Sequence, residues 1–312
     1  MIKAVTSDFF GCSKGLLIDN AYDQYTLNLY VQYSNSNQIE YLQSQDNELG
    51  YLNHFEHIKF LSIPEEATNF EELNRLKCLK GLGIFSSSLK DIDFNIIEKL
   101  EYLDIIFNSD IDIDFSRFKS LKYLRISHFP LKEIDIKNDL EVIELNYCKK
   151  IADLNFLKNL KNVKRIKLDY LPKLENIIGL NSISKKIEII EIIDCKKIYG
   201  LEEVLSGLPK LKSIVIITRE TDSKMQLRSL CFLEKLMKLE SFATDYKILD
   251  GDLSYLLNLN DAKITAFYKN YNLRDSDLPH ISVAINDNGT VKRVKLDSLE
   301  LGKNDKRIIW LN

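Results

Sequence analysis

The chain of 312 residues is long enough to bury a sizeable core without disulfides, and its 45% hydrophobic and 29% charged content excludes a largely disordered protein. Its 43 basic and 46 acidic residues give a formal charge of −3 and are mixed along the chain, so it lacks the basic excess that neutralises phosphates. We therefore expect no nucleic-acid partner.

The sequence shows neither a targeting signal nor the cysteine spacing of a disulfide scaffold or a zinc site. The first twenty residues carry charges at short intervals, and no stretch approaches 18 uninterrupted apolar residues. These features predict a cytoplasmic protein without a membrane partner. The five cysteines lie far apart with no CxxC pair, which favours reduced core thiols over disulfides or a zinc site.

Residues 1–57 precede the repeats described below and are predicted to form an N-terminal cap. Within them, the segment YTLNLYVQY alternates Leu27, Leu29 and Val31 with polar or aromatic neighbours. This alternation is typical of a half-buried strand. Solenoids need terminal caps with a polar outer face, and this is the role that we expect for the region.

Residues 58–268 carry an internal repeat. The hexapeptide apolar-x-x-apolar-x-apolar recurs with spacings of 19 to 28 residues, beginning at Ile58, Leu79, Leu100, Leu121, Leu140, Val163, Ile187, Leu211 and, more weakly, at Leu239 and Leu259. Most of these spacings lie in the range of roughly 20–29 residues that defines one class of solenoid repeat.

Each repeat predicts one short strand and one return segment. The fourth and sixth hexapeptide positions should point into the core, whereas the third and fifth should point to the opposite, concave face. Return segments such as LNFLKNLKN, FEELNRLKCLKG and LEEVLSGLPK have apolar residues three and four apart, which predicts short α or 3-10 helices. The predicted fold is an α/β solenoid with a parallel sheet on the concave face, short helices on the convex face and β-rich caps.

The repeats resemble those of leucine-rich-repeat proteins. The segments Leu140–Ile151 and Ile187–Ile198 look like the cysteine-containing variant of the family, with Cys148 and Cys195 at the ninth position. The stretch IADLNFLKNLKNV is similar to the convex half of bacterial internalin-type repeats. Asn108 also fits the ninth position, where the resemblance implies a bond to the turn backbone; the other repeats depart from this pattern.

Residues 269–312 form the predicted C-terminal cap. Two β-rich runs, ISVAI and VKRVKL, flank a turn that contains Asn288 and Gly289. This combination predicts a β-hairpin.

The sequence contains no recognisable catalytic or metal-binding group. His54 and His57 are three residues apart without an evident third ligand. Gly81-Leu82-Gly83 lacks the third glycine of a dinucleotide loop, and the DIDID stretch at 110–114 lacks the Gly and Glu of a calcium loop. We expect no enzyme activity, no metal and no cofactor.

The concave face carries the candidate site. Its fifth positions alternate in charge through the middle repeats, and an aromatic set accompanies them. Opposite charges on neighbouring strands can pair, so the charged row is either a self-neutralising surface or a specificity element. Aromatic rows on a sheet favour partner binding, with Tyr102, Tyr123 and Tyr147 expected to line up on adjacent strands. The predicted partner-binding residues are Tyr102, Asp104, Phe107, Tyr123, Arg125, His128, Glu144, Tyr147, Lys167, Tyr170 and Glu191.

These features predict a non-catalytic module that docks a protein partner inside the cell. In a bacterium, one concrete version is an immunity protein that neutralises a toxin, and a regulatory scaffold is equally compatible. The alternatives are a substrate-recognition subunit or adaptor of an enzyme complex, and a sensor of a glycan or another ligand.

Overall fold

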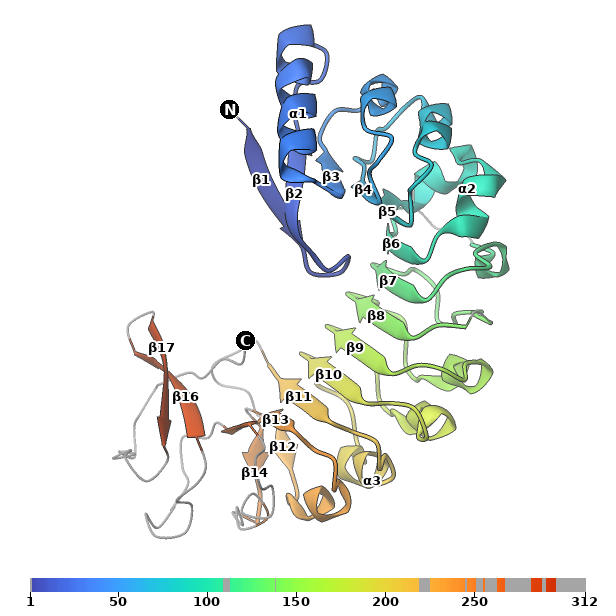
Figure 1. Ribbon diagram of the computed structural model, residues 1–312. Helices are drawn as coiled ribbons and strands as arrows, with labels where there is room; N and C mark the ends of the chain where they lie inside the picture. The colour runs from blue at the N-terminus through green and yellow to red at the C-terminus, as the bar shows by residue number, and fades with distance from the viewer. Residues whose placement is uncertain are drawn as a thin grey trace. The chain divides into compact units, whose positions relative to one another are not determined.

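The computed structural model describes residues 2–108, 113–137, 139–218, 225–244, 246–250, 255, 263–266, 282–287 and 290–295 (Figure 1). The chain divides into two compact units, Met1–Lys149 and Lys150–Asn312.

The N-terminal unit is one sheet with short helices on one side. Strands β2 to β8 follow one another in chain order and pair in parallel, while β1 pairs antiparallel with β2 at the edge. Its elements are β1 (Lys3–Ser7), β2 (Cys12–Ile18), α1 (Gln24–Asn37), β3 (Tyr41–Ser44), η1 (Gly50–His54), β4 (Phe60–Ser62), η2 (Phe70–Arg75), β5 (Gly81–Phe85), η3 (Ser86–Asp91), α2 (Phe94–Lys99), β6 (Tyr102–Ile106), η4 (Phe115–Arg117), β7 (Tyr123–Ser127) and β8 (Val142–Asn146).

The second unit repeats the same plan. Strands β9, β10, β11, β13 and β15 pair in parallel in that order, β12 pairs with β14 in parallel, and β16 pairs with β17 antiparallel. Its elements are η5 (Asn155–Asn159), β9 (Arg165–Asp169), η6 (Ile178–Ile183), β10 (Ile189–Ile193), α3 (Leu201–Ser206), β11 (Ser213–Ile217), β12 (Gln226–Leu227), η7 (Cys231–Lys235), β13 (Ser241–Thr244), β14 (Lys247–Ile248), β15 (Lys263–Ala266), β16 (Ser282–Asp287) and β17 (Thr290–Lys295).

The strand register confirms the hexapeptide alternation. Leu103 lies opposite Leu124 and Ile105 opposite Ile126, and all four side chains are fully buried. The outward residues between them are half-buried. The apolar positions of successive repeats therefore stack into one continuous core within each unit, because a single strand and its return segment cannot bury them alone.

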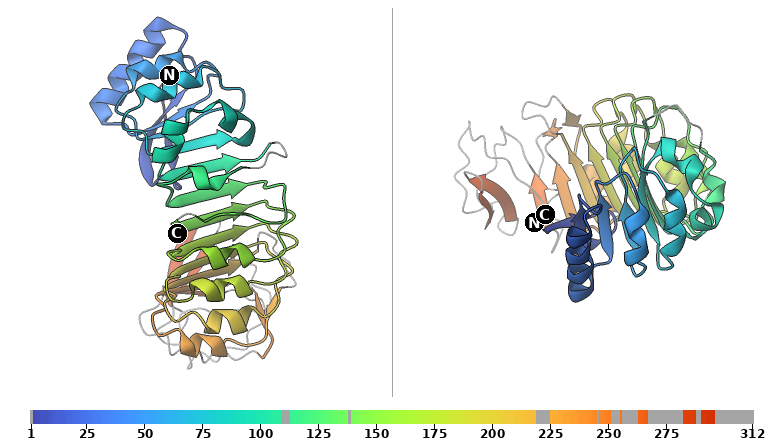
Figure 2. Two further views of the ribbon diagram at one scale, coloured as in Figure 1. Left: turned by 90° about the vertical axis from the view of Figure 1, so that its right-hand side faces the viewer. Right: turned by 90° about the horizontal axis from the view of Figure 1, so that it is seen from above.

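The return segments also behave as predicted. The three quoted stretches contain the 3-10 helices η5 and η2 and the α-helix α3. These helices lie on the outer side of the strands, which leaves the opposite, concave face of each sheet without helices (Figure 1 and Figure 2). We use the term concave face for that helix-free side throughout.

The strand predicted for YTLNLYVQY is wrong, because this segment belongs to helix α1. Asp23 caps the helix by accepting a hydrogen bond from the Thr26 backbone N–H at 2.8 Å. Leu27, Tyr30 and Ser34 form the buried face with helical spacings of three and four. The segment fits both periods, and the Asp23 cap favours the helix.

The two ends contain more regular structure than featureless caps. Parallel pairing extends from β4 back to β2, so the sheet begins before residue 58. The predicted hairpin near the C-terminus is confirmed by β16 and β17, which pair from Ser282–Lys295 to Asp287–Thr290. The limits 1–57, 58–268 and 269–312 remain predictions.

No helix within the described ranges combines the length and apolar character needed to cross a bilayer.

Candidate docking surface

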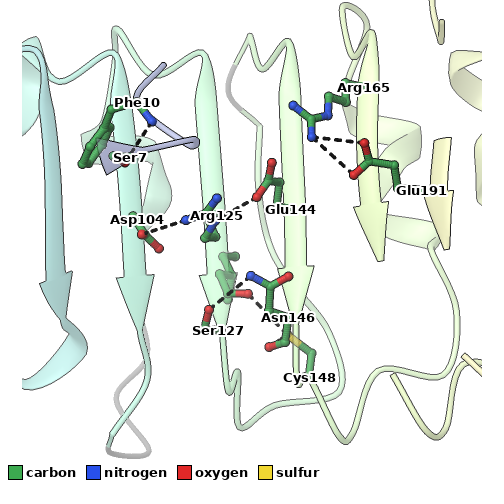
Figure 3. Close-up of polar contacts among 11 residues, drawn as sticks. Ser7, Phe10, Asp104, Arg125, Ser127, Glu144, Asn146, Cys148, Arg165 and Glu191 are labelled. Carbon is green, nitrogen blue, oxygen red and sulfur yellow. Dashed lines mark hydrogen bonds and ion pairs between the residues drawn. The ribbon is translucent and has the colours of Figure 1, made fainter. Parts of the chain in front are cut away.

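Three charged residues lie on the concave face of the last three strands of the N-terminal unit. Asp104, Arg125 and Glu144 come from β6, β7 and β8 and lie opposite one another in the strand register (Figure 3). The Arg125 guanidinium contacts Glu144 Oε2 at 2.8 Å through Nε and Asp104 Oδ2 at 3.3 Å through Nη1. The expected charge alternation is therefore present, and here Arg125 pairs with both carboxylates.

Burial affects the two carboxylates of this group differently. The Glu144 side chain is only 4% exposed, and its Oε2 atom pairs with Arg125. At Asp104, burial raises the pKa above its ordinary value, and the neighbouring Arg125 charge opposes this rise. The group is a rigid, partly desolvated network rather than a set of freely solvated charges.

The aromatic residues occupy two rows instead of one. Tyr102 and Tyr123 begin their strands and stack with ring centroids 4.1 Å apart and planes 4° apart. Tyr123 lies opposite Val142, however, and Tyr147 follows the opposite end of that strand. The prediction that Tyr147 lines up with Tyr102 and Tyr123 is therefore wrong.

Tyr147 instead belongs to a second row at the strand ends. Its ring stacks on that of His128, with centroids 5.3 Å and planes 13° apart. His128 and Tyr147 each follow the last residue of a strand and have positive φ values of 60° and 55°. In the second unit, Tyr170 and Asp194 hold the same place and conformation, with φ of 56° and 53°. We call these positions the rim of each unit, His128 and Tyr147 in the first and Tyr170 and Asp194 in the second.

The rim geometry follows from backbone hydrogen bonding. The His128 N–H donates to Asn146 O, the Tyr170 N–H to Ile193 O and the Asp194 N–H to Ile217 O, so these three rim residues still bond to the next strand. The left-handed backbone then turns the chain away from the sheet. The side chains of Tyr147 and Tyr170 remain 38% exposed, a large value for aromatic rings.

Phe107 does not belong to either row. Its side chain is 5% exposed and packs edge-on against Phe129, with ring centroids 4.9 Å apart. It occupies the same hexapeptide-relative position as His128 and Tyr147, but it lacks their positive φ and points into the core. Phe107 therefore offers no contact area to a partner, which corrects the prediction.

The turn of the β1–β2 hairpin covers the first aromatic row, which the sequence reasoning missed. Phe9 and Phe10, 7% and 5% exposed, form a cluster with Tyr41 and Phe60, against which Tyr102 and Tyr123 pack. The Arg125 guanidinium lies 4.4 Å from the centroid of the Phe9 ring. The Phe-Phe-Gly turn between two short extended runs was the available signal.

The glycine at the start of β5 makes room for this cluster. A Cβ atom at Gly81 would lie 2.6 Å from Phe60 Cδ1, 2.9 Å from Tyr102 Cβ and 3.1 Å from Phe10 Cε1. Strand β5 thus provides a flat floor on which the aromatic rings pack. This close approach explains the glycine at this position.

In the second unit, the predicted charges lie as expected but pair differently. Lys167 is opposite Glu191 in the β9–β10 register. The ion pair to Glu191 comes instead from Arg165, whose Nη2 lies 3.2 Å from Oε1 (Figure 3). Arg165 occupies the third position of its hexapeptide, which the sequence reasoning did not consider for charge.

The ninth-position cysteines stabilise the turns, as the resemblance implies. The Cys148 thiol donates to Asn146 O at 3.4 Å, and the Cys195 thiol donates to Ile193 O at 3.5 Å. Burial raises the pKa of each thiol to about 12, so both are unreactive at neutral pH. Asn108 differs, because it is exposed and its Oδ1 accepts the Ser87 N–H at 3.2 Å.

Only some of the residues considered for metal chemistry lie in the described part of the chain. Within the described part of the chain, no group of three His, Cys, Asp or Glu residues could hold a metal ion. The His57 Nε2 atom lies 3.2 Å from Ser34 Oγ. Asp110 and Asp112 of the DIDID stretch lie outside the described residues.

The repeated hexapeptides, the in-register parallel strands and the short outer helices define the class: the chain is a leucine-rich-repeat solenoid. A crystal structure of an internalin, InlF, from Listeria monocytogenes strain 4b F2365 shares 18% identity over 73% of this chain and 74% of that chain, with a TM-score of 0.47. A TLR13–ssRNA13 complex shares 16% identity over 84% of this chain, with a TM-score of 0.42, and this chain spans about half of that one (48%). No family model and no curated protein matches the sequence.

Proposed function

We propose that this protein is a non-catalytic binding module that docks a protein partner on the concave face, with the rim residues as its principal contacts. The observation that carries the proposal is that His128, Tyr147 and Tyr170 combine an exposed ring with a left-handed backbone. This conformation costs a non-glycine residue on the order of 1 kcal/mol.

Glycine would hold the same turn without that cost, so the turn itself does not require a ring at these positions. Strain of this kind is typical of functional sites. Tyrosine in particular provides large contact area with a polar tip, and it is enriched among the residues that dominate binding energy at interfaces. A role in partner contact explains why the chain keeps rings where glycine would be more stable.

The charged residues beside the rim would supply specificity. In the N-terminal unit, the network of Asp104, Arg125 and Glu144 is already held in one geometry, so little side-chain entropy is lost on binding. In the second unit, Lys167 has no carboxylate within ion-pairing distance among the described residues and would attract an acidic group. One concrete form of this proposal is a cytoplasmic immunity protein that occludes a toxin, for which a rigid, preformed surface is suited.

The test is affinity capture from native lysate with the tagged full chain and with rim variants. We expect the double variant His128→Gly/Tyr147→Gly and the single variant Tyr170→Gly each to lose the captured partner, with unfolding temperatures close to wild type. Met237→Ala is the matched control, because this side chain is 89% exposed and follows η7 on the helix-bearing side.

Two results would contradict the proposal. Capture that survives all three rim substitutions would exclude the rim as the contact. Capture that is lost in Met237→Ala alone would move the interface to the helices.

A further inference from the structure

The concave face of the N-terminal unit already carries an occupant from its own chain. Phe10 stacks on Phe60 with centroids 5.2 Å and planes 22° apart, and Phe9 meets Tyr102 edge-on at 6.4 Å. Figure 1 shows the turn between β1 and β2 reaching over the strands of this unit, and Figure 3 places Phe10 above them. We call the surface formed by Tyr41, Phe60, Gly81, Tyr102, Tyr123 and Arg125 the aromatic trough.

The tip of the hairpin is held to the trough by ring contacts, while its hydrogen bonds are local. The Phe10 N–H donates to Ser7 Oγ at 3.3 Å, and the Gly11 N–H donates to Asp8 O at 3.2 Å. Gly11 completes the turn with a φ of +66°. The turn would therefore keep its own hydrogen bonds if it left the trough.

Asp104, which contacts Arg125 of the trough, carries a polar atom that the tip does not satisfy. Asp104 Oδ1 is buried and has no hydrogen-bond partner among the described residues, although Oδ2 contacts Arg125. A buried acceptor without a donor is costly, and the phenylalanine rings of the tip cannot supply one. An occupant that brought an N–H or O–H group to Asp104 would fit this surface better than the hairpin tip.

We propose that the aromatic trough is a second contact surface, which takes a partner loop carrying two adjacent aromatic residues in exchange for Phe9 and Phe10. The incoming rings would stack on Tyr102 and Tyr123, and one would lie under the Arg125 guanidinium as Phe9 does. A donor on the same loop would reach Asp104 Oδ1. This inference rests on the proposed docking function, and it adds the chemistry of the partner segment and its competition with the hairpin.

The exchange can be measured without the natural partner. Trp310 is the single tryptophan of the chain, so Phe9→Trp in a Trp310→Phe background makes the tip its only tryptophan. The probe is a cyclic peptide with residues 6–13 of this chain and Ser in place of Cys12. We expect it to shift the tryptophan emission to longer wavelength in a saturable way, in the mM range typical of competition with a tethered segment.

A second protein variant and a second peptide decide the outcome. Phe10→Ala, added to the Phe9→Trp protein, removes one of the two rings that hold the tip in the trough. It should lower the half-saturating peptide concentration about tenfold. A peptide with Ala in place of both Phe residues should leave the emission unchanged. If the Phe-Phe and Ala-Ala peptides act alike on the Phe10→Ala protein up to about 10 mM, the exchange is refuted. Rim variants do not enter this assay, so its failure would leave the proposed rim contact untouched.

Discussion

Arg125 connects most of the charged and aromatic contacts at the centre of the N-terminal unit. It contacts two carboxylates and the face of Phe9. The guanidinium suits this role because its planar fork bonds two carboxylates while its face lies on a ring. A lysine would provide one point charge and would lose the ring contact.

Arg125→Met should therefore destabilise the protein by about 3 kcal/mol, because it removes the 2.8 Å ion pair to the buried Glu144 carboxylate. Urea unfolding measures this loss. Lys122→Met is the matched control, since Lys122 pairs with Glu101 at the surface and is 49% exposed. It should cost less than about 1 kcal/mol. Equal losses in the two variants would show that burial of Glu144 does not matter.

Asp104 makes stability depend on pH in a defined direction. Its folded-state pKa lies above the ordinary 3.8, so between these two values the folded state binds more protons than the unfolded state. Its contribution to stability therefore falls as the pH rises through this window. Asp104→Asn does not titrate, so the variant should gain stability relative to wild type between about pH 4 and pH 7. A stability difference that stays constant across this range, measured by urea unfolding, would contradict the raised pKa.

At the scale of elements, strand β5 shows how one residue sets the surface above a strand. Gly81→Ala would force Phe60, Tyr102 and Phe10 apart and should cost about 1–3 kcal/mol in urea unfolding. Gly207→Ala is a control from the end of α3, where the nearest atom would be Val204 O at 3.3 Å and φ is −86°. If Gly81→Ala left the free energy of unfolding unchanged, the hairpin tip would not pack on strand β5.

The strands and their register were predictable because each repeat obeys a local rule. Leu82, Leu103 and Leu124 are fixed by a two-residue alternation and a constant spacing, and both are visible in the sequence. The same rule failed for Phe107, because the direction of a side chain just after a strand depends on φ at that residue. Composition and spacing carry no signal for that angle.

The long-range contacts of the candidate site were not predictable in the same way. Phe9 and Arg125 are far apart in the sequence, and only the folded hairpin brings them together. Helix α1 was missed for a different reason. Its apolar residues fit both the two-residue period of a strand and the period of a helix, and the cap at Asp23 favours the helix. The local pattern of the repeats therefore predicts the strands, whereas the position of the β1–β2 hairpin over them is seen only in the structure.

At the scale of the whole molecule, four of the five thiols divide into an exposed pair and a buried pair. Cys78 and Cys231 are exposed, whereas Cys148 and Cys195 are buried and have pKa values raised to about 12. In native buffer, iodoacetamide should modify the first two and spare the second two, as read by mass spectrometry of tryptic peptides. Rapid native labelling of Cys148 or Cys195 would contradict the buried turns.

These two protected thiols also report on the two units separately. Cys148 belongs to the N-terminal unit and Cys195 to the second. Each should become reactive only when urea unfolds the unit that contains it. Gly81→Ala should therefore shift the labelling of Cys148 to lower urea, because the substitution lies in the same unit.

At the rim, the contacts that hold the left-handed turn differ from the side chain that the turn exposes. Its turn is secured by main-chain bonds and by buried neighbours such as Cys148, whereas the Tyr147 ring is 38% exposed. Many different side chains could therefore replace that ring at little cost to folding. A lineage of such proteins could change its binding target by exchanging one exposed residue per repeat, while the leucines beneath remain the same.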